Sequence, residues 1–125
     1  MKVLVCGSRK PLHTTKRDVF EYLDYIHSKL QITFLIHGAA RGIDTMARDW
    51  AIDREIAVRG YPADWKKYGG MAGPIRNSEM LRKEEDIKTV VAFEGGRGTN
   101  DMVSKALREG IRVIQHEQRV RRSSI

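Results

Sequence analysis

The sequence contains one cysteine, Cys6, among 125 residues, so no disulfide can form within the chain. Its apolar runs, such as 3–6 and 90–93, are only a few residues long, whereas a membrane helix needs about 20. Met1 and Lys2 lead directly into a strand-like run with no signal-peptide pattern. We therefore expect a cytoplasmic protein in a reducing compartment, with no membrane partner.

Several motifs that mark known chemistries are missing as well. The loop Gly95-Gly96-Arg97-Gly98-Thr99 lacks the Gly-Lys-Ser/Thr ending of a triphosphate-binding loop, and Gly7-Ser8-Arg9 lacks the three spaced glycines of a dinucleotide site. The four histidines show no metal-ligand spacing, and Ser8 lacks the Gly-x-Ser-x-Gly elbow of a hydrolase. We expect no metal and no cofactor.

Positive charge is in excess, with a net charge of +7 and a pI of about 9.8, which favours anionic partners. Part of the charge lies at Arg119, Arg121 and Arg122, near the end of the chain. We expect residues 1–115 to form one domain and residues 116–125 to be a basic, flexible tail. A nucleic-acid arm is the other interpretation of this tail, and the solvated one is favoured.

Short apolar runs alternate with amphipathic stretches, as in repeated strand–helix units. Strands are expected over 2–6, 33–37, 56–61, 89–93 and 111–114. Helices are expected after a capping box at Thr15, near Asp44, from Pro74 through Leu81, and from a cap at Thr99 to Gly110. Right-handed crossovers then predict an α/β fold: a Rossmann-like, doubly wound parallel sheet of order 3-2-1-4-5 with helices on both faces.

Glycine-rich loops follow three of these strands. They are Gly7-Ser8-Arg9, Gly38-Ala39-Ala40-Arg41-Gly42 and Gly95-Gly96-Arg97-Gly98-Thr99. Such a loop before a helix can aim backbone N–H groups and the positive end of the helix dipole at a phosphate. The predicted strand order brings the three loops together where the winding reverses, so we expect a shared site for a nucleotide-type ligand.

Individual side chains have both a binding and a structural interpretation. The hydroxyl groups of Ser8 and Thr99 would donate hydrogen bonds to a phosphate. In the structural interpretation, Ser8 stabilises a turn and Thr99 caps a helix. Arg9 and Arg76 are the preferred phosphate contacts, Asp44 either orients a ribose or starts its helix, and Asn77 is a base or sugar contact. The expected ligand-binding residues are Gly7, Ser8, Arg9, Gly38, Ala39, Gly42, Asp44, Arg76, Asn77, Gly95, Gly96, Gly98 and Thr99.

Aromatic residues in the long connection at 62–73 raise a further question. Trp65 and Tyr68 could form a stacking wall for a base. Aromatic side chains in such a connection more often pack it onto the body of the domain, and this interpretation is favoured.

The ordered motifs resemble one protein family over nearly the whole chain, from Lys2 to about Ile114. They are Gly7-Ser8-Arg9, His37-Gly38-Ala39-Ala40-Arg41-Gly42-Ile43-Asp44, Ala63-Asp64-Trp65, Gly73-Pro74-Ile75-Arg76-Asn77 and Gly95-Gly96-Arg97-Gly98-Thr99. They look like the YspA-type branch of the SLOG superfamily, which includes the Lonely guy enzymes and part of DNA-processing protein A. The resemblance implies a Rossmann-like fold, a site for nucleotides or nucleotide-derived molecules, and a homo-oligomer (dimer or tetramer).

One departure from the Lonely guy motif Pro-Gly-Gly-x-Gly-Thr-x-x-Glu bears on activity. Glu94 stands at its first position, and Met102 replaces the glutamate that belongs to the catalytic set of those enzymes. A thioether cannot transfer a proton, which puts glycosidic cleavage in doubt. If the chain is an enzyme, Arg76 and Asp101 are the catalytic candidates, although Asp101 is turned roughly 100° from Met102 on a helix.

Three functions follow from these observations. The leading hypothesis is a module that senses or sequesters a nucleotide-derived ligand, as in phage–bacterial conflict or stress signalling. The alternative is a nucleoside 5′-monophosphate phosphoribohydrolase like the Lonely guy enzymes. A nucleic-acid binder ranks third, because no interleaving of aromatic and basic residues marks a strand-binding groove.

Overall fold

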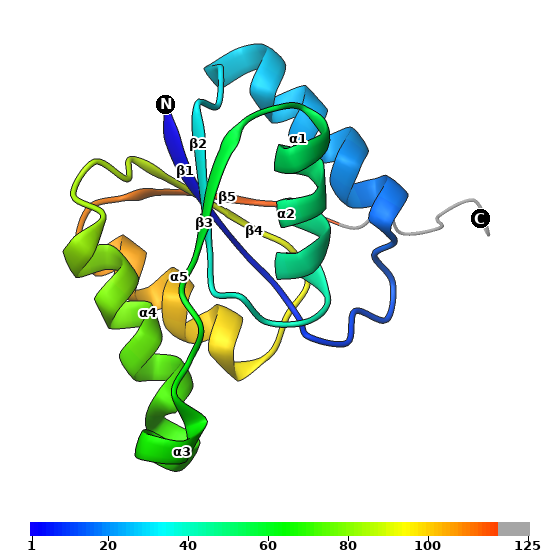
Figure 1. Ribbon diagram of the computed structural model, residues 1–125. Coiled ribbons are helices and arrows are strands. Elements are labelled where there is room, and N and C mark those ends of the chain that lie inside the picture. The colour runs from blue at the N-terminus through cyan, green and yellow to red at the C-terminus, as the bar shows by residue number, and fades with distance from the viewer. Residues whose placement is uncertain (118–125) are drawn as a thin grey trace, which may run out of the picture.

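The computed structural model describes residues 1–117 as five strands alternating with helices (Figure 1). All but the first two residues of the expected basic tail lie outside this range. The strands are β1 (Lys2–Cys6), β2 (Phe34–His37), β3 (Ala57–Gly60), β4 (Thr89–Ala92) and β5 (Arg112–Gln115). The helices are α1 (Lys16–Leu30), α2 (Ile43–Asp53), α3 (Trp65–Tyr68), the 3-10 helix η1 (Gly69–Met71), α4 (Ala72–Lys83) and α5 (Arg97–Arg108).

The five strands form one parallel sheet in the order β3-β2-β1-β4-β5, which confirms the predicted order. β1 pairs with both β2 and β4, with Leu4 opposite Ile36 on one side and Val90 on the other. The direction of winding therefore reverses between β1 and β4. In sheets of this kind, ligands bind beyond the carboxyl ends of the strands at that point.

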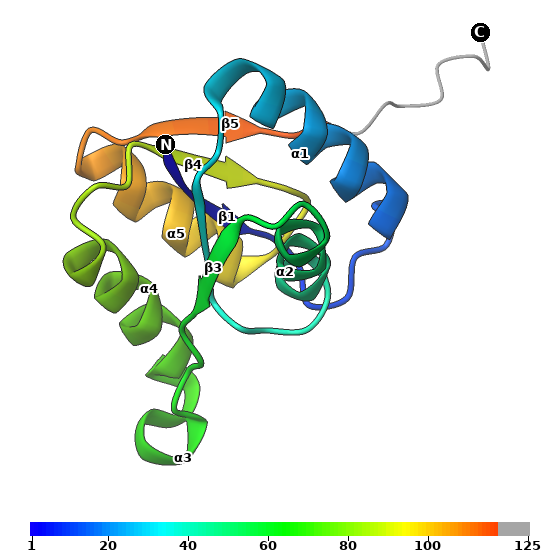
Figure 2. The same ribbon diagram turned by 45° about the horizontal axis from the view of Figure 1, so that its top comes forward.

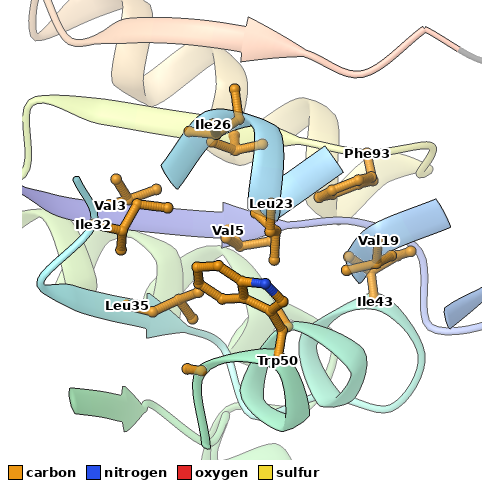
Figure 3. Close-up of a cluster of buried hydrophobic side chains, with 13 residues drawn as sticks. Val3, Val5, Val19, Leu23, Ile26, Ile32, Leu35, Ile43, Trp50 and Phe93 are labelled. Atoms are coloured by element: carbon orange, nitrogen blue, oxygen red, sulfur yellow. The ribbon is translucent and has the colours of Figure 1, made fainter. Parts of the chain in front are cut away.

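Helices cover both faces of the sheet, as expected. Figures 1 and 2 show α1 and α2 on one face and α4 and α5 on the other, with α3 projecting at one end. Each face has its own apolar cluster because the central strands β1, β2 and β4 are buried on both sides and must be covered twice. Under α1 and α2, the fully buried Trp50 packs among the residues drawn in Figure 3, and its Nε1 donates to Asp24 at 2.8 Å.

Helix α1 begins as its sequence predicts. Thr15 and Asp18 form a reciprocal capping box, in which the Thr15 hydroxyl accepts from the Asp18 N–H at 3.1 Å. From this start, Val19, Leu23 and Ile26 are buried along one face of the helix. Local capping and helical periodicity therefore agree with the packing.

Two predicted helix starts are wrong. Thr99 does not cap α5, because the cap is Gly96 and Thr99 is the third helical residue, buried against Gly95. Pro74 is the third rather than the first residue of α4, since η1 runs directly into that helix. Pro74 still fits there because the N–H groups of a first helical turn have no partner within the helix.

No helix within residues 1–117 is long and apolar enough to cross a membrane.

Candidate functional site

The three glycine-rich loops lie against one another at the carboxyl edge of the sheet. The N–H of Ser8, after β1, donates to the carbonyl oxygen of Glu94, after β4, at 2.7 Å. The carbonyl oxygen of Ser8 in turn accepts from the N–H of Ile43, at the start of α2, at 3.0 Å. Backbone hydrogen bonds therefore join all three loops, as the predicted strand order required.

Close approach between the first two loops depends on Gly42. Its φ of +75° lies in the left-handed region, and a Cβ atom there would overlap the carbonyl oxygen of Ser8. The carbonyl oxygen of Arg9 would be only 2.6 Å away. Gly7 is similarly close to Ile43, whose Cγ1 would lie 2.5 Å from an added Cβ. Both glycines therefore have a packing role in joining these loops.

The loop after β2 uses its backbone amides internally. Asp44 Oδ2 accepts from the N–H groups of Gly38 and Ala40 at 3.1 and 3.2 Å, and His37 Nδ1 accepts from the N–H of Ala39 at 2.9 Å. These three amides therefore have partners within the loop, and the expectation that Gly38 and Ala39 contact a ligand stays a prediction. Asp44 organises the loop, and Ala39 adopts a φ of +56° within it.

Burial shifts the pKa values of both side chains that hold this loop. Asp44 is 5% exposed, and burial raises its pKa to about 6, against the lowering effect of the Ala40 amide and the Arg76 charge. Burial, with the charges of Arg48 and Arg76, lowers the pKa of His37 to about 4. His37 is therefore neutral at pH 7, which leaves its Nδ1 able to accept the Ala39 N–H.

Arg76 on α4 reaches across the edge of the sheet to this loop. Its Nη1 donates to the carbonyl oxygens of Gly38 and, at 3.3 Å, Tyr61, while its Nε donates to Asn77 Oδ1 at 3.0 Å. A Cβ on Gly38 would lie 2.6 Å from Nη1, so this glycine makes room for the guanidinium. Nη2 has no hydrogen bond to any described residue, so one side of this anchored cation can bind an anion.

A second guanidinium lies near Arg76. Burial lowers the pKa of Arg76, the charge of Arg9 lowers it further, and that of Asp44 opposes the change. Neither arginine forms an ion pair within residues 1–117. The Cζ atom of Arg9 lies 5.6 Å from the ring centroid of Trp65. The fold thus places two like charges together without the carboxylate ion pairs that usually accompany them.

The first turn of α5 contributes further hydrogen-bond donors. Gly96, Arg97 and Gly98 are exposed, and no side chain caps the helix at Gly96. Space around Gly96 and Gly98 is open, with no heavy atom within 4 Å of an added Cβ. The uncapped N–H groups and the helix dipole therefore present a positive end at this edge of the sheet. Ser8 adds a hydroxyl whose oxygen accepts from the Lys10 N–H at 3.0 Å and whose proton can be donated elsewhere.

Asn77 links the arginine to this helix. Its Nδ2 donates to the Gly98 carbonyl oxygen at 3.2 Å and to Asp101 Oδ2 at 3.1 Å. Lys105 Nζ also donates to Asp101 Oδ2, at 2.8 Å. Met102 is 1% exposed in the core beneath α5 and so cannot touch a ligand. The position that resembles a catalytic glutamate is therefore a packing position here.

The sequence singled out Glu94 only as a departure from a motif, and the structure gives it a supporting role. Its carboxylate accepts from the N–H groups of Leu12 and His13, at 2.9 and 2.7 Å, and from the hydroxyl of Thr14 at 2.7 Å. It thereby fixes the segment that leads from the first loop into α1. Its location directly after a buried strand was the available signal, but its partners lie about 80 residues away in sequence.

A hollow of about 190 Å³ is lined by the end of β4 and the loop after it, the first turns of α5 and the end of β5. Phe93, Thr99 and His116 are among its lining residues, whereas Arg9 and Arg76 are not. The arginine pair therefore lies outside this hollow. Residues 1–117 contain no group of three side chains able to hold a metal ion.

The sheet order and the loops at its switch point define a Rossmann-like α/β protein. The crystal structure of TM1055, a structural-genomics target, shares this fold with a TM-score of 0.69 and 21% identity, over 90% of this chain and 71% of that one. The sequence model of the YspA, cpYpsA-related SLOG family matches residues 1–68. The Gene 61 protein of Mycobacterium phage D29 is 34% identical over 121 residues, which cover 90% of this chain and 94% of that protein. The chain belongs to the YspA, cpYpsA-related SLOG family, as its motifs indicated.

Proposed function

We propose that this protein binds a nucleotide or nucleotide-derived phosphate ligand at the edge of the sheet between Arg9, Arg76 and the start of α5. The observation that carries the proposal is that Arg9 and Arg76, 67 residues apart in sequence, lie around the same tryptophan, Trp65, and that neither forms an ion pair within residues 1–117. Two guanidiniums beside an open helix N-terminus offer the charge and the donors that a phosphate group requires. Membership of a SLOG family agrees with a nucleotide-related role.

The ligand-contacting set proposed from this geometry is smaller than the set expected from sequence. Arg9, Arg76, the Ser8 hydroxyl and the first-turn amides of α5 would contact the phosphate. Gly7, Gly38, Ala39, Gly42 and Asp44 would shape the loops that hold these groups, and Thr99 would pack beneath them. The module would act by sensing or sequestering its ligand.

A thermal-shift experiment with nucleoside monophosphates, cyclic nucleotides and ADP-ribose tests the proposal. A ligand that binds only the folded state raises the free energy of unfolding, and well above Kd this gain grows with the logarithm of the ligand concentration. We expect at least one phosphate-bearing compound to raise the Tm, with the gain abolished in Arg76→Ala. The proposal fails if every compound at millimolar concentration leaves the Tm unchanged. Native mass spectrometry of protein purified without added ligand would identify a nucleotide that co-purifies.

Cleavage of a nucleotide N-glycosidic bond is a second candidate, favoured by one observation. The Asp101 carboxylate lies beside Gly98 and is hydrogen-bonded to Asn77, so an acidic group does border the site. Lys105 Nζ forms an ion pair with the same oxygen at 2.8 Å. Release of free adenine from AMP, lost in Asp101→Asn, would support an enzyme. Adenine release no faster than in buffer without protein would exclude this enzymatic function.

A further inference from the structure

Trp65 is an exposed aromatic residue whose ring lies next to Arg9 of the proposed phosphate site. It opens the four-residue helix α3, directly after the connection that leaves β3. Its side chain is 49% exposed, whereas Trp50 is completely buried. Packing, the interpretation favoured from sequence, accounts for only part of this side chain.

One direct contact and one shared neighbour connect Trp65 with the two arginines. Arg9 lies over its ring at 5.6 Å from the centroid. A Cβ atom on the buried Gly73 would lie 3.7 Å from Trp65 Cη2 and 4.0 Å from Arg76 Nη2. The indole edge and the unpartnered nitrogen of Arg76 therefore approach the same point on α4. One small molecule can touch both.

From this arrangement we infer that Trp65 is the stacking platform for the base of the ligand, which makes the ligand a molecule with a planar heteroaromatic base next to its phosphate. The inference rests on the proposed function. A phosphate held by Arg9 and Arg76 has Trp65 as its neighbouring apolar surface, and every base has a π-face that can stack on an indole. Arg9 completes the platform, because a guanidinium can lie over an aromatic ring while it contacts a phosphate.

Trp65 would therefore make the affinity for nucleotides higher than the affinity for phosphates that lack a base. Inorganic phosphate and ribose 5-phosphate can satisfy the two arginines but gain nothing from the indole. A nucleoside 5′-monophosphate gains the stacking contact as well. The ratio of its affinity to that of ribose 5-phosphate measures the contribution of the platform.

Calorimetric titration of the full chain with inorganic phosphate, ribose 5-phosphate and the four nucleoside 5′-monophosphates tests this inference. We expect at least one monophosphate to bind about 10-fold or more tightly than ribose 5-phosphate. Trp65→Ala should remove that advantage and leave the ribose 5-phosphate affinity unchanged, and Trp65→Phe should retain part of it. Tyr68→Ala is the matched control, because Tyr68 lies on the same short helix and is 40% exposed.

Tryptophan fluorescence gives a second readout that does not depend on affinity alone. The tightest monophosphate should change the emission of the wild type but not that of Trp65→Phe, whose remaining Trp50 is buried. Equal affinities for ribose 5-phosphate and all four monophosphates would overturn the inference and leave the phosphate site standing. Emission that changes with protein concentration and not with ligand would also overturn it, since a second copy would then cover Trp65. If none of the compounds binds, the proposed function itself fails.

Discussion

Arg76 on α4 donates a hydrogen bond to the carbonyl oxygen of Gly38, so the helix after β3 holds the loop after β2. The same side chain has a nitrogen without a partner in the described chain and lies close to the charge of Arg9. Its position is therefore fixed by the fold while part of its hydrogen-bonding capacity remains available. An anion-binding residue needs both properties.

Removing Arg76 should weaken binding of phosphate ligands more than it weakens the fold. A hydrogen bond to a charged group contributes about 1.5–3 kcal/mol, so Arg76→Ala should reduce affinity roughly 10- to 100-fold. Arg9→Ala should also reduce it, by a smaller factor, because Arg9 is exposed. Calorimetric titration measures both effects. Arg82→Ala, which removes an exposed arginine from the same helix, serves as the control and should bind like the wild type.

Gly42→Ala should destabilise the protein by about 1–3 kcal/mol, because alanine at a φ of +75° is strained and its Cβ would overlap the Ser8 carbonyl. Urea unfolding followed by circular dichroism measures the loss. Gly70→Ala is the comparison, since a Cβ at Gly70 meets no heavy atom within 4 Å. If both variants unfold at the same urea concentration, the first two loops do not pack as described.

Asp44 should make stability fall as the pH rises from about 4 to about 6. Burial raises its pKa from 3.8 to about 6, so in this interval the folded state keeps a proton that the unfolded state has lost. Asp44→Asn cannot titrate and should gain stability relative to the wild type over the same interval, by up to about 3 kcal/mol. Both proteins contain His37, whose opposite dependence therefore cancels in the difference. Urea unfolding at pH 4, 5, 6 and 7 gives the curve, and a constant difference would contradict the account.

Glu84 should stabilise the protein near neutral pH. Although burial raises its pKa, hydrogen bonds from Lys2, Tyr61 and Arg59 lower it to about 2. The contribution is complete above about pH 4.5 and is lost as the pH falls through 2. Glu84→Gln should therefore cost roughly 3 kcal/mol at pH 7 and less in acid. Thermal unfolding at pH 7 and pH 3 measures this cost, with the exposed Glu85→Gln as the control.

The sequence was sufficient for the fold because local and long-range signals agreed. The runs from Val3 to Cys6 and from Val90 to Ala92 are apolar at every position. The structure places them in β1 and β4, the two strands between which the winding reverses. The rule of right-handed crossovers then left one natural strand order. Helix starts were less predictable, since Thr99 has the chemistry of a cap but Gly96 takes the position.

The site could be located from sequence but not described in detail. Glycines after parallel strands predicted where the loops would meet. In the second loop, Asp44 and His37 accept hydrogen bonds from backbone N–H groups. This arrangement depends on side-chain packing, and the composition of the loop does not determine it. The proximity of Trp65 to Arg9 depends on how α3 and η1 turn the connection into α4, and no pattern in residues 62–73 specifies that turn.

The central claim is that Arg9, Arg76 and the start of α5 form one anion site. Nuclear magnetic resonance of ¹⁵N-labelled protein tests it most directly, by titration with the monophosphate that gives the largest thermal shift. We expect concerted shifts of the Arg9 and Arg76 Nε–H signals and of the backbone amides of Arg97 and Gly98, all with one Kd. Shifts confined to another surface, or arginine signals that stay fixed while the ligand binds, would contradict it.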